Sequence, residues 1–228
     1  MSTQFRLPLT APPTYGREDF AVSGCNADAV ARVDAWPNWP EGRLALVGPV
    51  GSGKTHLART WAARTGAVVI NAEATQPPDL PALRGRAVLV EDADQRSASA
   101  SLSDEDLFHI LNMAGVDGGS VLLTARVAPI AWGCAVPDLR SRLNALTVAE
   151  IAEPDDVVLR AVLERAFRAE HLKPDPDLYP YLIARLPRSA AEGLAAAKLL
   201  DEAASQQHRA VNKALAREVL GDLEGEED

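Results

Sequence analysis

The sequence predicts an α/β protein with a nucleotide-binding domain on a five-stranded parallel sheet and a small all-α lid domain after it. Three observations support this prediction. Residues 48–55 fit the phosphate-loop pattern G-x-x-x-x-G-K-[ST] at every fixed position. Short apolar runs alternate with helical patterns between residues 43 and 151, as is typical of a parallel sheet. Beyond residue 153 only helical patterns follow.

The bulk composition fits a globular protein and excludes some classes of function. The 228 residues are 47% hydrophobic and 24% charged, which is ordinary for a folded domain. A net charge of −9 argues against broad binding to DNA phosphates, and we expect no direct sequence-specific DNA binding. No apolar run approaches the ~20 residues of a membrane helix, and prolines interrupt the N-terminus where a signal peptide would lie. We therefore expect a cytoplasmic protein without a membrane partner.

The phosphate loop has the flanks that such a site requires. An apolar strand is expected at 43–47 and a helix at 55–64, which Gly66 ends. Glycines let the loop point its N–H groups at phosphate oxygens, Lys54 would reach the β- and γ-phosphates, and Thr55 would bind Mg²⁺. The expected nucleotide contacts here are Gly48, Pro49, Val50, Gly51, Ser52, Gly53, Lys54, Thr55 and His56.

The other elements of the first domain follow from turn residues and periodicity. We expect them at 27–35 (helix), 67–71 (strand), 86–90 (strand), 103–114 (helix), 119–124 (strand), 137–143 (helix) and 146–151 (strand), with a proline-containing loop at 73–85. Pro37 stops the first helix, and Ser103 with Asp106 resembles a capping box for the second. The second domain should hold helices at 155–171, 177–186, 189–207 and 211–220. The boundaries are 1–13 (extended tail), 14–152 (α/β domain), 153–220 (helical lid) and 221–228 (acidic tail).

Polar residues at two strand ends are candidates for the chemistry. Glu91 and Asp92 follow an apolar strand in the Walker B manner, so we expect them to help hold Mg²⁺, with Asp92 also at the base position. Thr124 would contact a γ-phosphate or the attacking water, or it is simply a threonine at a strand end. The cysteines and histidines show no metal-ligand spacing.

A phosphate loop, a Walker B strand and a helical lid in this order resemble the AAA+ class of ATPases. The resemblance is closest to the bacterial replication initiator DnaA and covers roughly residues 14–220. Residues 15–26 resemble the part of DnaA that frames the adenine. The resemblance implies a bound ADP or ATP with Mg²⁺, and nucleotide contacts from Phe20, Val22 and Asn26.

Two arginines of this chain match functional positions of DnaA. Residues 138–143 resemble its box VII, whose second arginine, here Arg142, is the arginine finger. Arg188 stands where the sensor 2 arginine meets the phosphates, and residues 153–155 match the joint between base and lid. The resemblance therefore implies that Arg142 acts in trans on a nucleotide bound to another subunit.

The N-terminal tail carries a short pattern of its own. Its residues either pack back on the domain or form a linear motif for a partner's pocket, namely Gln4, Phe5, Leu7, Pro8 and Leu9. The pattern resembles the motif by which proteins dock on the bacterial sliding clamp. A clamp motif joined to a DnaA-like module without its DNA-reading domain resembles the Hda-type regulators, which are DnaA paralogues, and most closely their alphaproteobacterial form.

The Hda-type resemblance implies a function. On a clamp, the nucleotide-bound protein would stimulate ATP hydrolysis by DnaA through Arg142 and so prevent re-initiation of replication. Glu91 precedes Asp92 where AAA+ proteins generally have Asp then Glu, so we expect slow intrinsic hydrolysis at most. The alternatives are an active AAA+ ATPase of helicase-loader type, a small-molecule kinase and a DNA-binding initiator fragment. The oligomeric state stays open, and a homo-oligomer is one possible assembly.

Overall fold

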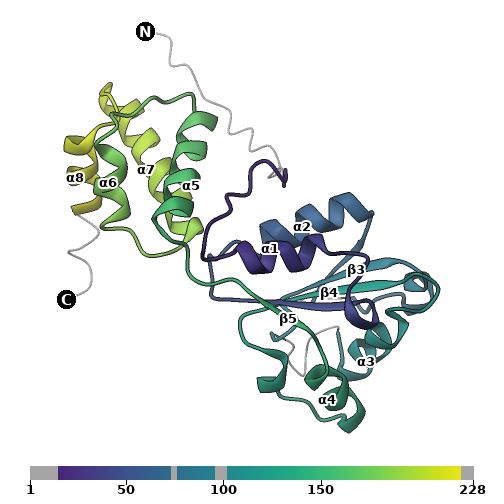
Figure 1. Ribbon diagram of the computed structural model, residues 1–228. Coiled ribbons are helices and arrows are strands. Elements are labelled where there is room, and N and C mark those ends of the chain that lie inside the picture. The colour runs from purple at the N-terminus through teal and green to yellow at the C-terminus, as the bar shows by residue number, and fades with distance from the viewer. Residues whose placement is uncertain (1–14, 73–75, 96–101, 222–228) are drawn as a thin grey trace.

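The computed structural model describes residues 15–72, 76–95 and 102–221. Its sheet consists of β1 (Arg43–Val47), β2 (Val68–Asn71), β3 (Ala87–Glu91), β4 (Ser120–Ala125) and β5 (Val148–Glu150). All neighbouring strands are parallel, in the order β2-β3-β4-β1-β5 (Figure 1). The predicted five-stranded parallel sheet is confirmed. Because β1 and β4 lie inside it, both are buried along their whole length.

Four helices cover the two faces of the sheet. They are α1 (Ala27–Asp34), α2 (Lys54–Thr65), α3 (Asp104–Met113) and α4 (Pro137–Asn144). The side chains of α1 and α2 pack on one face, against Leu44 and Leu46 among others, whereas α3 and α4 pack on the other (Figure 1). Short 3-10 turns occupy Pro40–Gly42, Leu80–Leu83 and Pro129–Ala131. The result is a three-layer α/β domain.

The helical part has its own hydrophobic core. It consists of α5 (Asp156–Ala169), α6 (Leu178–Ile183), α7 (Ala190–Gln207) and α8 (Lys213–Gly221). Phe167, Leu182 and Leu200 are fully buried among these helices. Asp155 begins α5 by accepting a hydrogen bond from the Val158 N–H at 3.0 Å. The hydrophobic core of the helical part is separate from the two hydrophobic clusters that lie on the faces of the sheet.

Local sequence signals explain several of the helix ends. Ser103 and Asp106 form both bonds of a capping box, so aspartate serves where glutamate or glutamine is usual. The left-handed Gly66 ends α2. The expected strand 146–151 is shorter in the structure, because only Val148–Glu150 pairs with β1.

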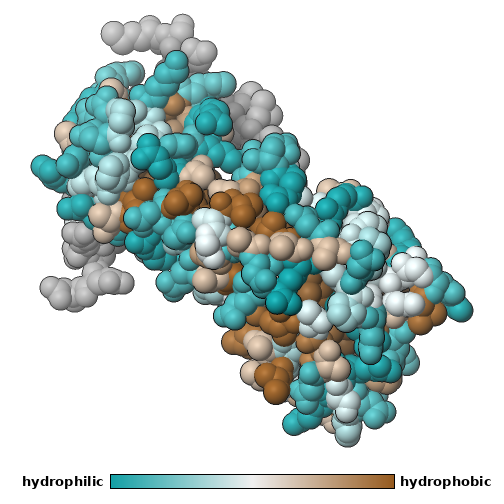
Figure 2. Space-filling model, in the orientation of Figure 1, coloured by the Kyte–Doolittle hydropathy of each residue, from teal (hydrophilic) through white to brown (hydrophobic). Residues whose placement is uncertain are grey.

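The surface carries apolar residues in two places on the face shown in Figure 2. One lies over the junction between the helical and α/β parts, and the other lies over the segment that joins β4 to α4. Ile130, in that segment, is 75% exposed. Among the residues that the structure describes, no helix is long and apolar enough to span a membrane.

Candidate nucleotide-binding site

The predicted phosphate loop leaves the end of β1 and turns directly into α2. Gly51 (φ 75°) and Gly53 (φ 97°) take left-handed conformations that strain residues with a side chain. Gly53 is also the N-cap of α2, so the positive end of the helix dipole lies behind the loop. This is the backbone geometry that an anion-binding nest requires.

Two buried polar groups point to an anion inside the loop. The Lys54 ammonium donates a hydrogen bond to the Pro49 carbonyl at 2.7 Å, and Lys54 is only 7% exposed. The Ser52 hydroxyl is buried and has no partner among the described residues. Buried polar groups are normally satisfied, and a phosphate oxygen would satisfy both. The residues of this loop therefore fit a nucleotide phosphate.

Burial is the largest influence on the pKa of Lys54. It lowers the pKa of Lys54 below the usual lysine value, because the loop excludes water from the ammonium. The carboxylates of Asp92 and Asp94 raise this pKa, and the Arg126 guanidinium lowers it. Three charged side chains thus lie near the expected phosphates besides Lys54 itself.

The structure brings Asp92 and Thr124 together at the carboxyl ends of β3 and β4. The Asp92 N–H donates to the Thr124 hydroxyl oxygen at 3.0 Å, and Thr124 is 1% exposed. The Ala93 N–H donates to the Thr124 carbonyl at 2.8 Å. Asp92 takes a left-handed backbone conformation, with φ 50°. The Thr124 hydroxyl therefore positions the Asp92 backbone. This structural role agrees with the alternative that Thr124 is simply a threonine at a strand end.

The structure pairs Glu91, a predicted Mg²⁺ ligand, with an arginine. Both of its oxygens pair with the Arg59 guanidinium: Oε1 accepts from Nε at 2.8 Å, and Oε2 accepts from Nη2. Glu91 is 5% exposed, and the hydrogen bond to it raises the pKa of Arg59. Arg59 follows Thr55 by one turn on the same face of α2. A fixed guanidinium thus neutralises the carboxylate at the metal position.

A further arginine begins beside the phosphate loop. The Arg126 N–H donates to Asp94 Oδ2 at 2.9 Å, and the carbonyl of the preceding Ala125 accepts from the Gly48 N–H at 3.2 Å. The Arg126 side chain is exposed. The backbone of Arg126 is therefore fixed at the point where the loop leaves β1. The Arg126 guanidinium is near enough to Lys54 to lower the pKa of that lysine.

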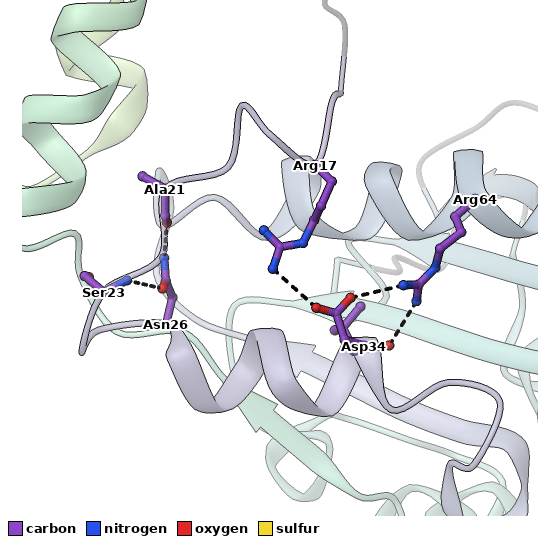
Figure 3. Close-up of polar contacts among 7 residues, drawn as sticks. Arg17, Ala21, Ser23, Asn26, Asp34 and Arg64 are labelled. Atoms are coloured by element: carbon purple, nitrogen blue, oxygen red, sulfur yellow. Dashed lines mark hydrogen bonds and ion pairs between the residues drawn. The ribbon is translucent and has the colours of Figure 1, made fainter.

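Asn26 holds the segment that the sequence predicts to frame the base. Its amide nitrogen donates to the Ala21 carbonyl at 2.9 Å, and its amide oxygen accepts from the Ser23 N–H at 2.9 Å (Figure 3). Asn26 is 2% exposed. Asn26 thus shapes this turn from inside, whereas Val22 is 45% exposed and available for contact.

Phe20 and His56 meet beside the phosphate loop. Their ring centroids are 5.5 Å apart, and a Cβ placed on Gly53 would lie 3.1 Å from the Phe20 ring. His56 Nε2 lies 3.1 Å from the Gly16 carbonyl oxygen. The aromatic ring from the N-terminal segment is therefore adjacent to the turn into α2.

The helical part touches the phosphate loop directly. The Ala190 N–H, in the first turn of α7, donates to the Gly51 carbonyl at 2.9 Å. A Cβ on Gly51 would lie 2.0 Å from the Ser189 hydroxyl oxygen, so only glycine allows this approach. The neighbouring Arg188 pairs with Asp156 at the start of α5, and both side chains are exposed. Arg188 thus lies just before α7, the helix that meets the loop, and its guanidinium contacts Asp156.

Arg142 lies at the other end of the sheet. It is on α4, its side chain is 43% exposed, and its Nη1 is 3.9 Å from Glu41 Oε2. Glu41 also pairs with Arg43 at 2.8 Å. Glu41 precedes β1, whereas the phosphate loop follows β1, and a five-residue strand is about 16 Å long. Arg142 therefore cannot reach the phosphate site of its own chain.

Some site residues were missed by sequence reasoning, and others lie outside the structure's description. Arg59 shares a face of α2 with Thr55, four residues earlier, but no local pattern marks it as the partner of Glu91. Nothing in the local sequence marks Asp156 as the partner of Arg188, 32 residues away. The tail residues Gln4, Phe5, Leu7, Pro8 and Leu9 lie outside the described residues.

Comparisons with known proteins point to DnaA. The chain is 34% identical over 164 residues to the chromosomal replication initiator protein DnaA of Caulobacter sp. (strain K31), covering 63% of this chain and 34% of that protein. Domain III of Thermotoga maritima DnaA superposes with a TM-score of 0.74 at 18% identity, covering 92% and 97% of the two chains. DnaA bound to AMPPCP and single-stranded DNA gives a TM-score of 0.65 at 21% identity, covering 86% and 69%.

These findings establish the fold and a homology. The structure has the AAA+ P-loop fold, and the chain is homologous in sequence to the AAA+ domain of DnaA. The chain spans about a third to a half of the length of the curated relatives that it matches. No protein-family model matches it.

Proposed function

We propose that this chain is an Hda-type regulator, an adenine-nucleotide-bound protein that docks on the DNA sliding clamp and stimulates ATP hydrolysis by DnaA. The stimulating group is Arg142, and DnaA left in its ADP form cannot restart chromosome replication. One observation carries the proposal: Arg142 is half exposed on α4, at the end of the sheet opposite its own phosphate loop. A guanidinium in that place is available only to a nucleotide on another molecule.

The surroundings of Arg142 support a role in recognition. Glu41 is close enough to orient the guanidinium but, at 3.9 Å and 64% side-chain exposure, too weakly held to trap it. Arg43, buried beside it, shares the same carboxylate oxygen of Glu41. A γ-phosphate carries more charge than one carboxylate and would compete successfully for Arg142.

A guanidinium placed on a γ-phosphate acts by stabilising charge. During phosphoryl transfer, negative charge spreads over the phosphate oxygens, and a fixed positive group lowers the energy of that state. Arginine fingers supplied by a second protein accelerate hydrolysis by about 10³–10⁵-fold. We expect the effect of Arg142 to lie in this range.

The chain's own nucleotide has a conformational role in this proposal. Lys54, the unpaired Ser52 hydroxyl and the turn at Gly51 fit phosphates, and a DnaA structure with AMPPCP supports an adenine nucleotide. Glu91 is paired with Arg59, and Asp92 is the shorter acid at the base position. Slow hydrolysis by this chain follows, and bound ADP would hold the lid on the loop.

The clamp is the proposed anchor for the N-terminal tail. The sequence of Gln4, Phe5, Leu7, Pro8 and Leu9 offers one amide and three apolar side chains, with a proline that limits the entropy lost on docking. The net charge of −9 favours a protein anchor over direct attachment to DNA. Tethering would raise the effective concentration of Arg142 near DnaA.

Phosphate release from ATP-loaded DnaA tests this proposal. The assay contains clamp loaded on DNA, and it compares the wild-type chain with Gln4→Ala and with Arg142→Ala. We expect Gln4→Ala to lose clamp binding in a pull-down and, with it, stimulation on clamp-loaded DNA. Arg142→Ala should keep clamp binding and lose stimulation. Full stimulation by both variants would refute the proposal.

The rival function is an active AAA+ ATPase of helicase-loader type, because the phosphate loop is intact. It predicts rapid ATP turnover by the chain alone, independent of residues 4–9. Turnover measured without DnaA and without clamp therefore separates the two functions.

A further inference from the structure

Arg59 and Glu91 form a contact that the proposed function does not use. The pair joins α2 to the end of β3, and both carboxylate oxygens of Glu91 accept from one guanidinium. Planar, two-point pairing of this kind is the strongest and most specific arrangement between these groups. Glu91 is 5% exposed and the Arg59 side chain is 36% exposed, so loss of the guanidinium would leave a buried carboxylate unpaired.

The position of this pair is where a phosphate-loop protein would hold a divalent cation. Thr55 begins the face of α2 on which Arg59 lies one turn later, and Glu91 ends the strand whose carboxylate would face the cation. A cation in that place has two tasks: it neutralises the acid, and it offsets phosphate charge. In this chain Arg59 already performs the first task.

Two basic side chains of this region could contribute to the second task. Lys54 is held in the loop, and the exposed Arg126 begins beside Gly48, since Ala125 accepts from the Gly48 N–H. Burial lowers the pKa of Lys54 most, the Asp92 and Asp94 carboxylates raise it, and the Arg126 guanidinium lowers it. Lys54 and Arg126 thus bring positive charge to this end of the sheet, where the Asp92 and Asp94 carboxylates bring negative charge.

We propose that this chain binds its adenine nucleotide without requiring a divalent cation, because Arg59 occupies the carboxylate that would hold it. The inference rests on the proposed nucleotide binding and goes further, since it concerns the charge balance of the site. Arg59 is thus a positioning residue: it keeps Glu91 away from the phosphates and from the metal.

The test is the dissociation constant of a fluorescent ADP analogue in excess Mg²⁺ and in excess EDTA. For the wild-type chain we expect the two values to agree within about threefold, well below the tenfold that 1.4 kcal/mol represents. Weakening of tenfold or more in EDTA would overturn the inference. Failure to bind the analogue in either buffer would instead refute the proposed nucleotide binding, so the two failures are distinguishable.

Two variants identify the residue responsible. Arg59→Gln frees Glu91, and we expect this variant to bind the analogue about tenfold more tightly in Mg²⁺ than in EDTA. The double variant with Arg59→Gln and Glu91→Gln should lose that dependence again, because no carboxylate remains. An equal response to Mg²⁺ in both variants would contradict the assignment. The double variant also removes the unpaired buried charge, so it remains informative if Arg59→Gln alone folds poorly.

Arg64 on the same helix provides the matched control. It pairs with Asp34, which also pairs with Arg17, on the α1 side of α2 (Figure 3). The side chains of Arg64 and Asp34 are exposed, and neither residue lies at the phosphate loop. Arg64→Gln should bind the analogue like the wild type in both buffers. A Mg²⁺ dependence equal to that of Arg59→Gln would show that the loss of any positive charge on α2 produces it, and would contradict the role assigned to Arg59.

Discussion

The contact between the lid and the phosphate loop predicts an unusual sensitivity at Gly51. Alanine at this position would place its Cβ 2.0 Å from the Ser189 Oγ, 2.8 Å from its Cβ and 3.2 Å from its Cα. The last two atoms cannot rotate away, so α7 must retreat from the loop. The Ala190 N–H bond to the Gly51 carbonyl then lengthens or breaks. We therefore expect Gly51→Ala to undock the lid rather than to unfold the α/β domain.

Gly66 allows the size of this effect to be separated from backbone strain. It has a similar left-handed conformation (φ 66°), but a Cβ there would meet nothing within 4 Å. Both glycine-to-alanine changes carry a left-handed penalty of roughly 1–2 kcal/mol. Only Gly51→Ala adds a steric term, which is about 1–3 kcal/mol for an overpacked contact. That difference corresponds to about 5- to 150-fold in the docked-to-undocked ratio.

Amide hydrogen exchange measures this ratio at one atom. The exchange rate of the Ala190 N–H should rise at least about fivefold in Gly51→Ala relative to Gly66→Ala. Urea unfolding followed by tryptophan fluorescence reports on the α/β domain, where all four tryptophans lie, and should shift similarly for both variants. Equal exchange rates at Ala190 in the two variants would refute the reasoning.

Three further predictions concern helix starts and the lid. Ser103→Ala removes the capping box with Asp106 and should lower the free energy of unfolding by about 1 kcal/mol in urea. The Val158 N–H and other donors hold the pKa of Asp155 below its usual value. The stability that the ionised Asp155 contributes to the fold is therefore complete above about pH 3.9, and it is lost as the pH falls through the lower folded pKa. Asp155→Asn should therefore lose less stability than the wild type in acid titrations, and a steeper loss would contradict this. Asp156→Asn frees Arg188 from an exposed ion pair and should tighten ADP binding by up to about fivefold in a fluorescence titration, whereas weaker binding would show that Asp156 orients Arg188 productively.

Local signals predicted the parts of the site that follow one another in the chain. The strand before Gly48, the turn at Gly51 and Gly53, and the helix from Lys54 are all set by neighbouring residues. The parallel sheet was predictable for the same reason, because each apolar strand is followed by a crossover. The capping box was predictable as well, because its two residues, Ser103 and Asp106, are only three positions apart.

Pairings across the fold were not predictable from local patterns. The Glu91 partner Arg59 and the Arg188 partner Asp156 are each 32 residues distant in sequence. Which side chain neutralises a buried acid depends on how α2 crosses β3, and periodicity does not specify that. The strand-plus-acid pattern predicts a carboxylate at this strand end, but it does not predict that Arg59 pairs with that carboxylate.

Labelling the triphosphate bound to DnaA tests the proposed action of Arg142 in trans most directly. DnaA is loaded with ATP labelled at the γ-phosphate, the present chain is loaded with unlabelled ADP, and both are mixed on clamp-bound DNA under single-turnover conditions. We predict that label release accelerates by about 10³-fold or more and that the acceleration disappears in Arg142→Ala and in Arg142→Lys, which keeps the charge but not the planar fork. Arg160→Ala, which removes an exposed lid arginine paired with Glu164, should leave the acceleration intact. Undiminished label release in Arg142→Ala would contradict the account.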